Sequence, residues 1–106
     1  MADPIRSVPL IIGPDSRPQL PRSTKLRHDA ERGRWVLLAP ERVFTPDETG
    51  VAVLRLCDGK RTVTEVAQVL AGEYDAPVDQ ILADVIAMLQ DLADKGFLTE
   101  AREKTP

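Results

Sequence analysis

The sequence predicts an α+β fold, in which a three-stranded antiparallel sheet is followed by a three-helix bundle. Between residues 25 and 44, short apolar runs alternate with turn-forming residues, which is typical of strands. From residue 46 onward, apolar residues recur at helical spacing. Capping residues and glycines mark where each helix begins and ends. This order of elements is typical of a winged helix-turn-helix-like domain.

The composition favours a single small soluble domain. The chain has 106 residues, 42% of them hydrophobic, and a net charge of −3, so the overall field does not attract phosphate. It contains no apolar run of about 18 residues, which excludes a membrane span. Prolines and charges interrupt the N-terminus before a signal peptide could form. A single cysteine cannot form an internal disulfide, so we expect a cytoplasmic protein.

The N-terminal segment, residues 1–24, is predicted to be a disordered or loosely draped tail. Its prolines leave few places for a helix or a strand ladder. Its apolar island, Val8–Ile12, is either an incidental patch or a segment that docks on the domain's own groove or on a neighbouring copy. We expect the folded domain to span residues 25–100 and residues 101–106 to form a flexible tail. The five prolines of the segment are Pro4, Pro9, Pro14, Pro18 and Pro21.

Three short strands are predicted next. Lys25–His28 and Arg34–Ala39 are separated by Asp29–Gly33, a glycine-bearing insert that is typical of a β-hairpin loop. Glu41–Phe44 forms the third strand, because Val43 and Phe44 have high β propensity. Pro40 lies directly before it and lacks a donor, so this strand is expected at the edge of the sheet.

The first helix is predicted from Pro46 to Cys57. Thr45 is the expected N-cap, Pro46 occupies the first helical position, and Glu48 is placed to close a capping box. Asp58-Gly59 is expected to end the helix, because glycine tolerates the left-handed cap. The residues expected to face inward are Val51 and Leu54, with Val53 and Cys57 as further candidates.

Two further helices complete the domain. Thr62 and Glu65 form a capping box that starts a helix ending near Glu73. The third helix is predicted from near Pro77 to Lys95, about 28 Å at 1.5 Å per residue. Gly96 closes it, and Phe97-Leu98 return the chain to the core. Its apolar positions at helical spacing are Val78, Ile81, Leu82, Val85, Leu89 and Leu92.

The residues for catalysis are few. His28 is the only histidine, and a lone histidine in a strand is more often a structural or surface residue than a base. Cys57 lies on the apolar side of the first helix, where a buried thiol without a neighbouring base is unreactive. No His, Cys or carboxylate spacing predicts a metal site. We therefore expect a protein that is not an enzyme and has no cofactor.

The charge pattern of the third helix argues against nucleic-acid binding. The third helix would repel phosphates, because it carries four aspartates against the single lysine at its end. Basic residues gather instead around the predicted hairpin, at Arg22, Lys25, Arg27, Arg32 and Arg34. They form either an ordinary solvated face or a surface that attracts an acidic partner. The four aspartates are Asp79, Asp84, Asp91 and Asp94.

A groove is expected between the edge strand and the third helix. An edge strand displays unpaired N–H and C=O groups, which an extended peptide can satisfy by adding a strand. The apolar positions of the helix span more than a narrow stripe, so part of them is expected to line the groove. The alternative is a thick core helix with no groove. The candidate binding residues are Arg42, Val43 and Phe44 on the strand and Val78, Ile81, Leu82 and Val85 on the helix.

Three segments carry a resemblance to a known family. The run Arg34–Val43, the run Leu56–Val63, and Asp84-Val85 with the later leucines and Gly96 resemble PqqD, a small protein of pyrroloquinoline quinone (PQQ) biosynthesis. The similarity covers about residues 25–99. The segment VLLAPE followed by the CDG turn is fairly specific in combination.

The resemblance implies a peptide chaperone, a recognition element for ribosomally made and modified peptides. Such a domain binds its precursor peptide (PqqA-like) as an added strand between the third strand and the third helix. It presents the peptide to a radical SAM enzyme (PqqE-like), which links a glutamate to a tyrosine and holds the iron–sulfur chemistry. We expect a monomer or a weak or domain-swapped dimer. The remaining alternatives are a winged-helix DNA-binding domain and a structural dimerisation module.

Overall fold

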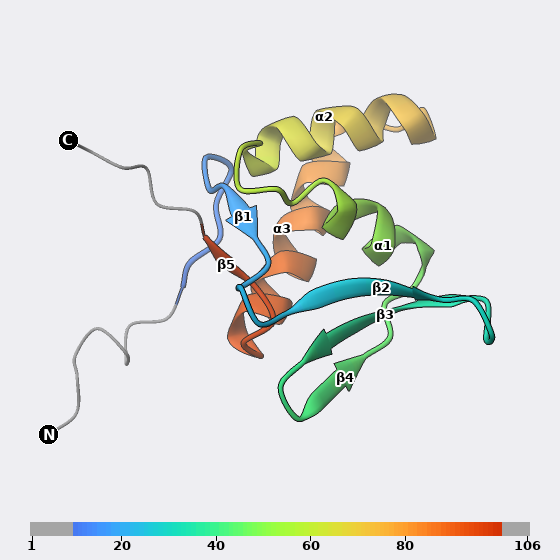
Figure 1. The fold of residues 1–106 in the computed structure, drawn as a ribbon. Helices are drawn as coiled ribbons and strands as arrows, with labels where there is room; N and C mark the ends of the chain where they lie inside the picture. The colour runs from blue at the N-terminus through green and yellow to red at the C-terminus, as the bar shows by residue number, and fades with distance from the viewer. Residues whose placement is uncertain (1–9, 101–106) are drawn as a thin grey trace, which may run out of the picture.

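The computed structural model describes residues 10–100, and Figure 1 shows the helices stacked against one face of a three-stranded sheet. The α+β class and the order of sheet and helices are confirmed. Within residues 10–100, no helix has both the length and the apolar character that crossing a membrane requires. In chain order the elements are β1 (Pro18–Gln19), β2 (Lys25–Asp29), β3 (Arg34–Ala39), β4 (Arg42–Phe44), α1 (Glu48–Arg55), α2 (Val63–Tyr74), α3 (Val78–Asp94) and β5 (Thr99–Glu100).

The three-stranded sheet is an antiparallel meander in the order β2-β3-β4. The predicted hairpin is confirmed, and its loop contains Gly33 with φ of +64°. A two-residue turn, Pro40 and Glu41, connects β3 to β4 and pairs Ala39 with Arg42. Glu41 has φ of +62°, the left-handed value that the second central residue of a type II turn requires. β4 pairs only with β3 among the described residues, so it is an edge strand, as predicted.

The sheet turns one face toward the helices. Leu37 of β3 is fully buried and pairs with Leu26 on one side and Phe44 on the other. Because strand residues alternate between faces, Val36 and Leu38 point to the opposite face. The core between sheet and helices contains Leu37, Val53, Leu54, Val63, Val66, Leu70, Val85, Leu89, Leu92, Phe97 and Leu98.

The first helix begins later than predicted. The N-cap of α1 is Asp47, whose Oδ1 accepts a hydrogen bond of 2.7 Å from the Gly50 amide, and the helix starts at Glu48. The expected Thr45 cap and Glu48 capping box are therefore wrong. Aspartate caps a helix as well as threonine does, and Thr45-Pro46 remains outside the helix before it. The residues predicted to face inward, Val51, Leu54, Val53 and Cys57, are all buried.

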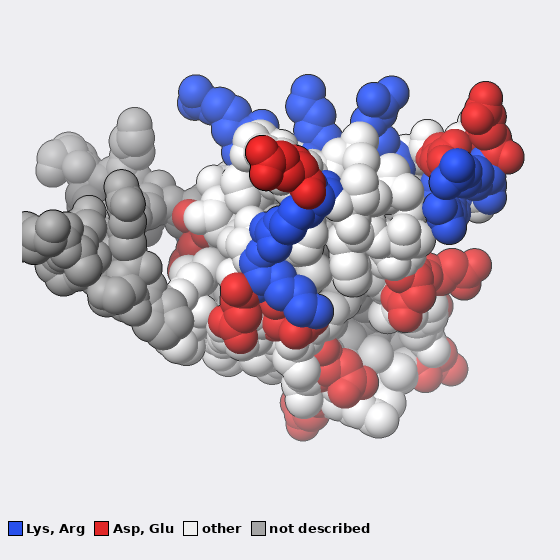
Figure 2. Space-filling view, turned by 90° about the horizontal axis from the view of Figure 1, so that it is seen from below, with Lys and Arg blue, Asp and Glu red and all other residues white. Residues whose placement is uncertain are grey.

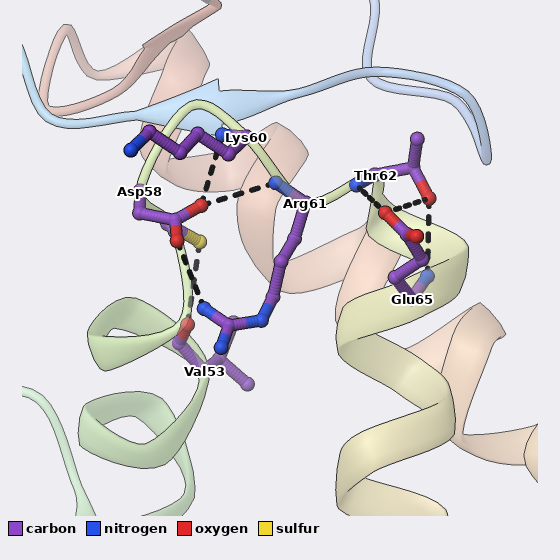
Figure 3. A network of polar contacts seen from close by, with 7 residues as sticks. Val53, Asp58, Lys60, Arg61, Thr62 and Glu65 are labelled. Carbon is purple, nitrogen blue, oxygen red and sulfur yellow. Dashed lines mark hydrogen bonds and ion pairs between the residues drawn. The ribbon is translucent and has the colours of Figure 1, made fainter.

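The other two helices agree closely with the sequence prediction. Thr62 caps α2, and Thr62 and Glu65 make the predicted reciprocal capping box (Figure 3). α3 follows Pro77 and ends at the Lys95 cap. Gly96 then adopts φ of +85°, which reverses the chain and buries the next two residues, as predicted.

The prediction of a loose N-terminal tail is wrong from residue 10 onward. Ile12 is only 4% exposed and belongs to the core. The amide side chain of Gln90 on α3 holds this segment in place: its Nε2 donates to the Leu10 carbonyl at 2.7 Å, and its Oε1 accepts from the Ile12 amide at 2.8 Å. The apolar island thus docks on its own domain, at least through its described part. Residues 1–9 and the predicted tail 101–106 lie outside the described residues.

The segment continues along the start of α2 and into a second, two-stranded sheet. The carbonyls of Pro14 and Ser16 accept hydrogen bonds from the Thr64 and Val63 amides at 3.0 and 2.9 Å. β1 then pairs with β5, on the left of Figure 1. Proline removes a donor and keeps its carbonyl, so a proline-rich segment can still accept hydrogen bonds from a helix N-terminus. Proline count alone therefore misassigned this segment.

Candidate binding groove

The groove begins with the free edge of β4. In a two-residue hairpin the residues that flank the turn, here Ala39 and Arg42, exchange the closing hydrogen bonds. Hydrogen-bonded and non-hydrogen-bonded pairs alternate along an antiparallel ladder, so the next pair, Leu38 with Val43, is not hydrogen-bonded. The N–H and C=O of Val43 consequently point away from β3. Val43 is 65% exposed, and its backbone groups are accessible to an incoming strand.

A cavity of about 270 Å³ lies beside this edge. It opens between the end of β4, the segment that leads into α1, and the second half of α3. Its walls are mostly apolar, and they carry two carboxylates, Asp47 and Asp91. Lys95 pairs with Asp91 at 2.9 Å, while Asp47 is committed to capping α1. The lining residues are Phe44, Thr45, Pro46, Asp47, Gly50, Met88, Asp91 and Leu92.

An aromatic pair ties β4 to the chain after α3. The rings of Phe44 and Phe97 lie 5.7 Å apart between centroids. The guanidinium carbon of Arg42 lies 4.3 Å from the centroid of the Phe97 ring, a cation–π contact. A Cβ at Gly96 would lie 3.0 Å from Arg42 Nη2, so a larger residue there would push the Arg42 side chain away from its present position. The position of β4 is therefore fixed by its side-chain contacts with the segment that follows α3.

A second cavity, of about 250 Å³, lies among the three helices. It shares Asp47, Gly50 and Met88 with the first, so the two cavities meet at these residues. Gly50 matters at this junction, because a Cβ there would lie 3.1 Å from Pro46 Cβ and 3.4 Å from Met88 Cε. The lining residues are Asp47, Thr49, Gly50, Val53, Leu70, Tyr74, Ile81, Asp84, Val85 and Met88.

The structure brings together only part of the predicted site. Phe44 lines the first cavity, while Ile81 and Val85 line the second. Leu82 is half-buried against the core, and Val78, 38% exposed, lines neither cavity. The helix residues that share a cavity with β4 are instead Met88, Asp91 and Leu92. Leu92 belonged to the predicted helical stripe, but the sequence alone did not reveal which half of the helix lies opposite the strand.

The two residues considered for catalysis lie away from this groove. The His28 ring sits 5.1 Å from the Trp35 ring on the β2–β3 hairpin. Cys57 is buried, and its Sγ donates to the Val53 carbonyl at 3.3 Å. Burial, together with the nearby Asp58 charge, raises the pKa of Cys57 to about 12, so the thiol stays protonated at neutral pH. Among residues 10–100, no group of three His, Cys, Asp or Glu side chains is placed to hold a metal ion.

Asp58 organises the turn between α1 and α2 (Figure 3). Its Oδ1 accepts hydrogen bonds from the Lys60 and Arg61 amides at 2.9 and 3.0 Å, and its Oδ2 pairs with Arg61 Nη1 at 2.9 Å. Backbone amides that donate to the ionised carboxylate lower its pKa below the ordinary value of 3.8, and Arg61 adds to the effect. The CDG turn noted in the sequence thus has a structural role.

Fold and site together define a class: small winged-helix-like domains that combine an open strand edge with an adjoining apolar cavity. Comparison with known proteins identifies the family. The family profile of PqqD, described as coenzyme PQQ synthesis protein D, matches residues 34–98. The chain belongs to this family.

Relatives and solved structures agree with this assignment. The chain is 66% identical over 90 residues to a "PqqA binding protein" of Bradyrhizobium diazoefficiens, an alignment that covers 85% of this chain and 87% of the relative. It is 51% identical over 81 residues to the "Bifunctional coenzyme PQQ synthesis protein C/D" of Methylorubrum extorquens, covering 76% of this chain and 22% of that much longer protein.

Two solved structures share the fold. One is the solution NMR structure of the PqqD truncation of Methylobacterium extorquens PqqCD, described as a functional, stand-alone recognition element for ribosomally synthesised and modified peptides. It superposes with a TM-score of 0.73 and 46% identity, covering 83% of this chain and 94% of that chain. The other is the crystal structure of PqqD from Xanthomonas campestris, with a TM-score of 0.50, 42% identity, and coverage of 79% and 93%.

Proposed function

We propose that this chain is a non-catalytic peptide chaperone of PQQ biosynthesis. In this proposal it binds a PqqA-like precursor peptide in extended form and presents it to a PqqE-like radical SAM enzyme. The observation that carries the proposal is the outward backbone of Val43 beside an apolar cavity. The name of the Bradyrhizobium relative, "PqqA binding protein", supports the choice of peptide.

The peptide would add to the sheet as a fourth strand. Main-chain hydrogen bonds to Val43 would supply affinity. Because side chains alternate along a strand, half of the peptide's side chains would point to each face of the sheet. One set points toward α3, where an apolar side chain can enter the cavity between Phe44 and Met88. Because β4 is already ordered, only the peptide loses conformational freedom on binding, which lowers the cost of association.

The remaining predicted site residues have different places in this proposal. Arg42 lies at the start of β4 and offers its charge to an acidic peptide while resting on Phe97. Ile81 and Val85 supply a second apolar anchor, which a peptide passing Met88 can reach. Val78, exposed at the start of α3, and Leu82, packed against the core beside Ile81, are proposed as contacts for a further part of the peptide.

The charge on α3 favours a peptide over DNA as the ligand. The four aspartates of this helix named above are all exposed. A recognition helix with this charge would repel a phosphate backbone. A dimerisation module remains the rival that uses the same edge, and it predicts self-association without affinity for a short peptide.

A titration followed by NMR tests the proposal. Isotope-labelled protein is titrated with the PqqA-like peptide, and we expect the largest amide shifts at β4 and at the α3 residues around Met88. The same titration with duplex DNA is the control for nonspecific charge effects. Absence of shifts at near-millimolar peptide would contradict the chaperone function, and shifts confined to α2 would contradict the location of the groove.

A further inference from the structure

The outer face of the three-stranded sheet carries an apolar stripe that no described element covers. Val36 and Leu38 lie on the face opposite Leu37, and the register places Val43 beside Leu38 on the same face. Arg27 pairs with Val36 across β2 and β3 and therefore flanks the stripe. A hollow of about 270 Å³ adjoins it, lined by Arg27, His28, Asp29, Ala30, Glu31, Val36 and Leu38.

This face is basic in an acidic chain. Residues 25–34 contain four basic and two acidic side chains, whereas the whole chain has a net charge of −3. Lys25, Arg27 and Arg34 are all exposed, and Asp29 is partly neutralised by Arg32, whose Nε lies 3.9 Å from its Oδ2. In Figure 2, basic side chains project along the upper rim of the molecule, and acidic side chains are spread over the rest of the view, some of them beside basic ones.

We propose that this outer face docks an acidic-rimmed apolar patch of the peptide-modifying enzyme. The inference rests on the proposed function, because its geometry follows from strand addition. A peptide paired with β4 extends the sheet, so half of its side chains join the face that already displays Val43. A partner seated on Val36 and Leu38 therefore touches the chaperone and the peptide at once.

The charges decide the kind of partner. An apolar patch flanked by lysine and arginine fits a surface of opposite sign, and such complementarity orients the encounter and excludes basic partners. The acidic face of α3 offers the opposite sign and does not continue into the added strand. The outer face is thus the surface on which one partner can contact the protein and the bound peptide at the same time.

A matched pair of charge reversals tests this inference, with the radical SAM enzyme itself as the probe. The variant Lys25→Glu/Arg27→Glu changes the outer face. The control Arg17→Glu/Lys60→Glu changes the net charge equally at exposed positions elsewhere. Enzyme affinity is expected to fall at least tenfold in the first variant and to stay within twofold in the control.

Peptide affinity, measured by NMR on the same variants, separates this inference from the proposed function. Peptide binding is expected to stay within twofold in both. If the outer-face variant retains full enzyme affinity while binding peptide normally, the docking surface is wrong and the chaperone function stands. If the unmodified chain binds no peptide, the proposed function itself fails.

A second variant guards against indirect effects of charge. Val36→Thr keeps the side-chain shape and the β propensity but places a hydroxyl in the apolar stripe. We expect a several-fold loss of enzyme affinity with an unchanged unfolding midpoint. Wild-type affinity should also fall as salt rises from about 0.05 to 0.3 M, because the pairing is electrostatic. A flat salt profile, or no effect of Val36→Thr, would overturn the inference.

Discussion

Two extended segments of this molecule meet other elements in contrasting ways. β1 is enclosed: the Pro18 carbonyl accepts from the Gly59 amide at 3.0 Å, and Gln19 pairs with Thr99 and bridges to Asp58. Among residues 10–100, β4 pairs on one side only, and Val43 directs its backbone away from β3. The N-terminal segment therefore fills the first place, whereas no residue of 10–100 pairs with the outer edge of β4.

The comparison shows what an extended segment needs to bind this fold. The N-terminal segment is held by carbonyls that accept from amides, by the amide side chain of Gln90, and by one buried apolar anchor, Ile12. The β4 edge offers the same kinds of contact to an external segment: free backbone groups and an apolar cavity beside Phe44. Substitutions can therefore separate the closed place, which the N-terminal segment fills, from the open place beside β4.

The largest effect is expected at the closed place. Ile12→Ala removes a core side chain, so the free energy of unfolding should fall by about 2–4 kcal/mol. Its neighbour Ile11 is 69% exposed, and Ile11→Ala should change stability by less than about 0.5 kcal/mol. Urea unfolding of the two variants provides the measurement. Equal stabilities of the two variants would mean that the Ile12 side chain contributes nothing to the core.

The next effect is expected at the open place. Val43→Pro removes an N–H that points away from β3, so the β3–β4 ladder keeps its hydrogen bonds while the peptide loses one. Peptide affinity should fall at least tenfold, about 1.4 kcal/mol, with little change in unfolding midpoint.

Val43→Thr is the control for this edge variant, because it retains the N–H and the β-branched shape. It should bind peptide within about twofold of the original chain, given that only the hydroxyl differs. Isothermal titration measures both variants. Full affinity of the proline variant would remove β4 from the binding site.

A smaller effect is expected in the cavity wall. Met88→Ala deletes apolar surface shared by both cavities, which should weaken peptide binding by about 1 kcal/mol, or roughly fivefold. Val69→Ala, on an exposed position of α2 that lines neither cavity, is the matched control. Affinities measured by titration should differ between the two variants. A loss of the same size in both would point to a general stability effect.

The smallest effect is expected at the turn that β1 contacts. The pKa of Asp58 is lowered in the folded chain, so its contribution to stability is present above the ordinary value of 3.8 and is lost as pH falls through the folded pKa. Asp58→Asn should therefore be less stable than the original chain at about pH 6, and this gap should narrow on acidification to about pH 2.5. Urea midpoints at both pH values measure it. A gap independent of pH would remove the charge as the cause.

The sequence revealed most where local chemistry decides the outcome. The capping box of Thr62 and Glu65 placed the start of α2, and the glycine-bearing loop placed the hairpin. The predicted start of α1 was two residues too early, because Thr45 and Asp47 are both good N-cap residues. In the structure it is Asp47 that accepts the hydrogen bond from the Gly50 amide. Such a choice between neighbouring caps depends on packing that periodicity does not encode.

The features that the sequence did not predict depend on contacts between residues far apart in the chain. Nothing near Ile12 in the sequence indicates that Gln90 will hold its segment, 78 residues away. The same limit applies to the groove: the edge strand could be predicted, but the part of α3 that shares a cavity with its Phe44 could not. Helical spacing identified the apolar side of α3, but the Phe44–Phe97 contact determines which half of it faces β4.

The pairing of β1 with β5 also determines how this unit can be carried by a longer protein. It brings both described ends of the chain to one side of the fold, as the Arg17 amide and Glu100 Oε2, 3.4 Å apart, illustrate. In the Methylorubrum relative, a unit similar to this one is a fifth of a bifunctional chain. A tether joined to either described end would start beside β1 and β5 and not at the outer edge of β4. A peptide bound at the β4 edge would then encounter the linked domain at an effective concentration in the millimolar range, as short flexible tethers provide.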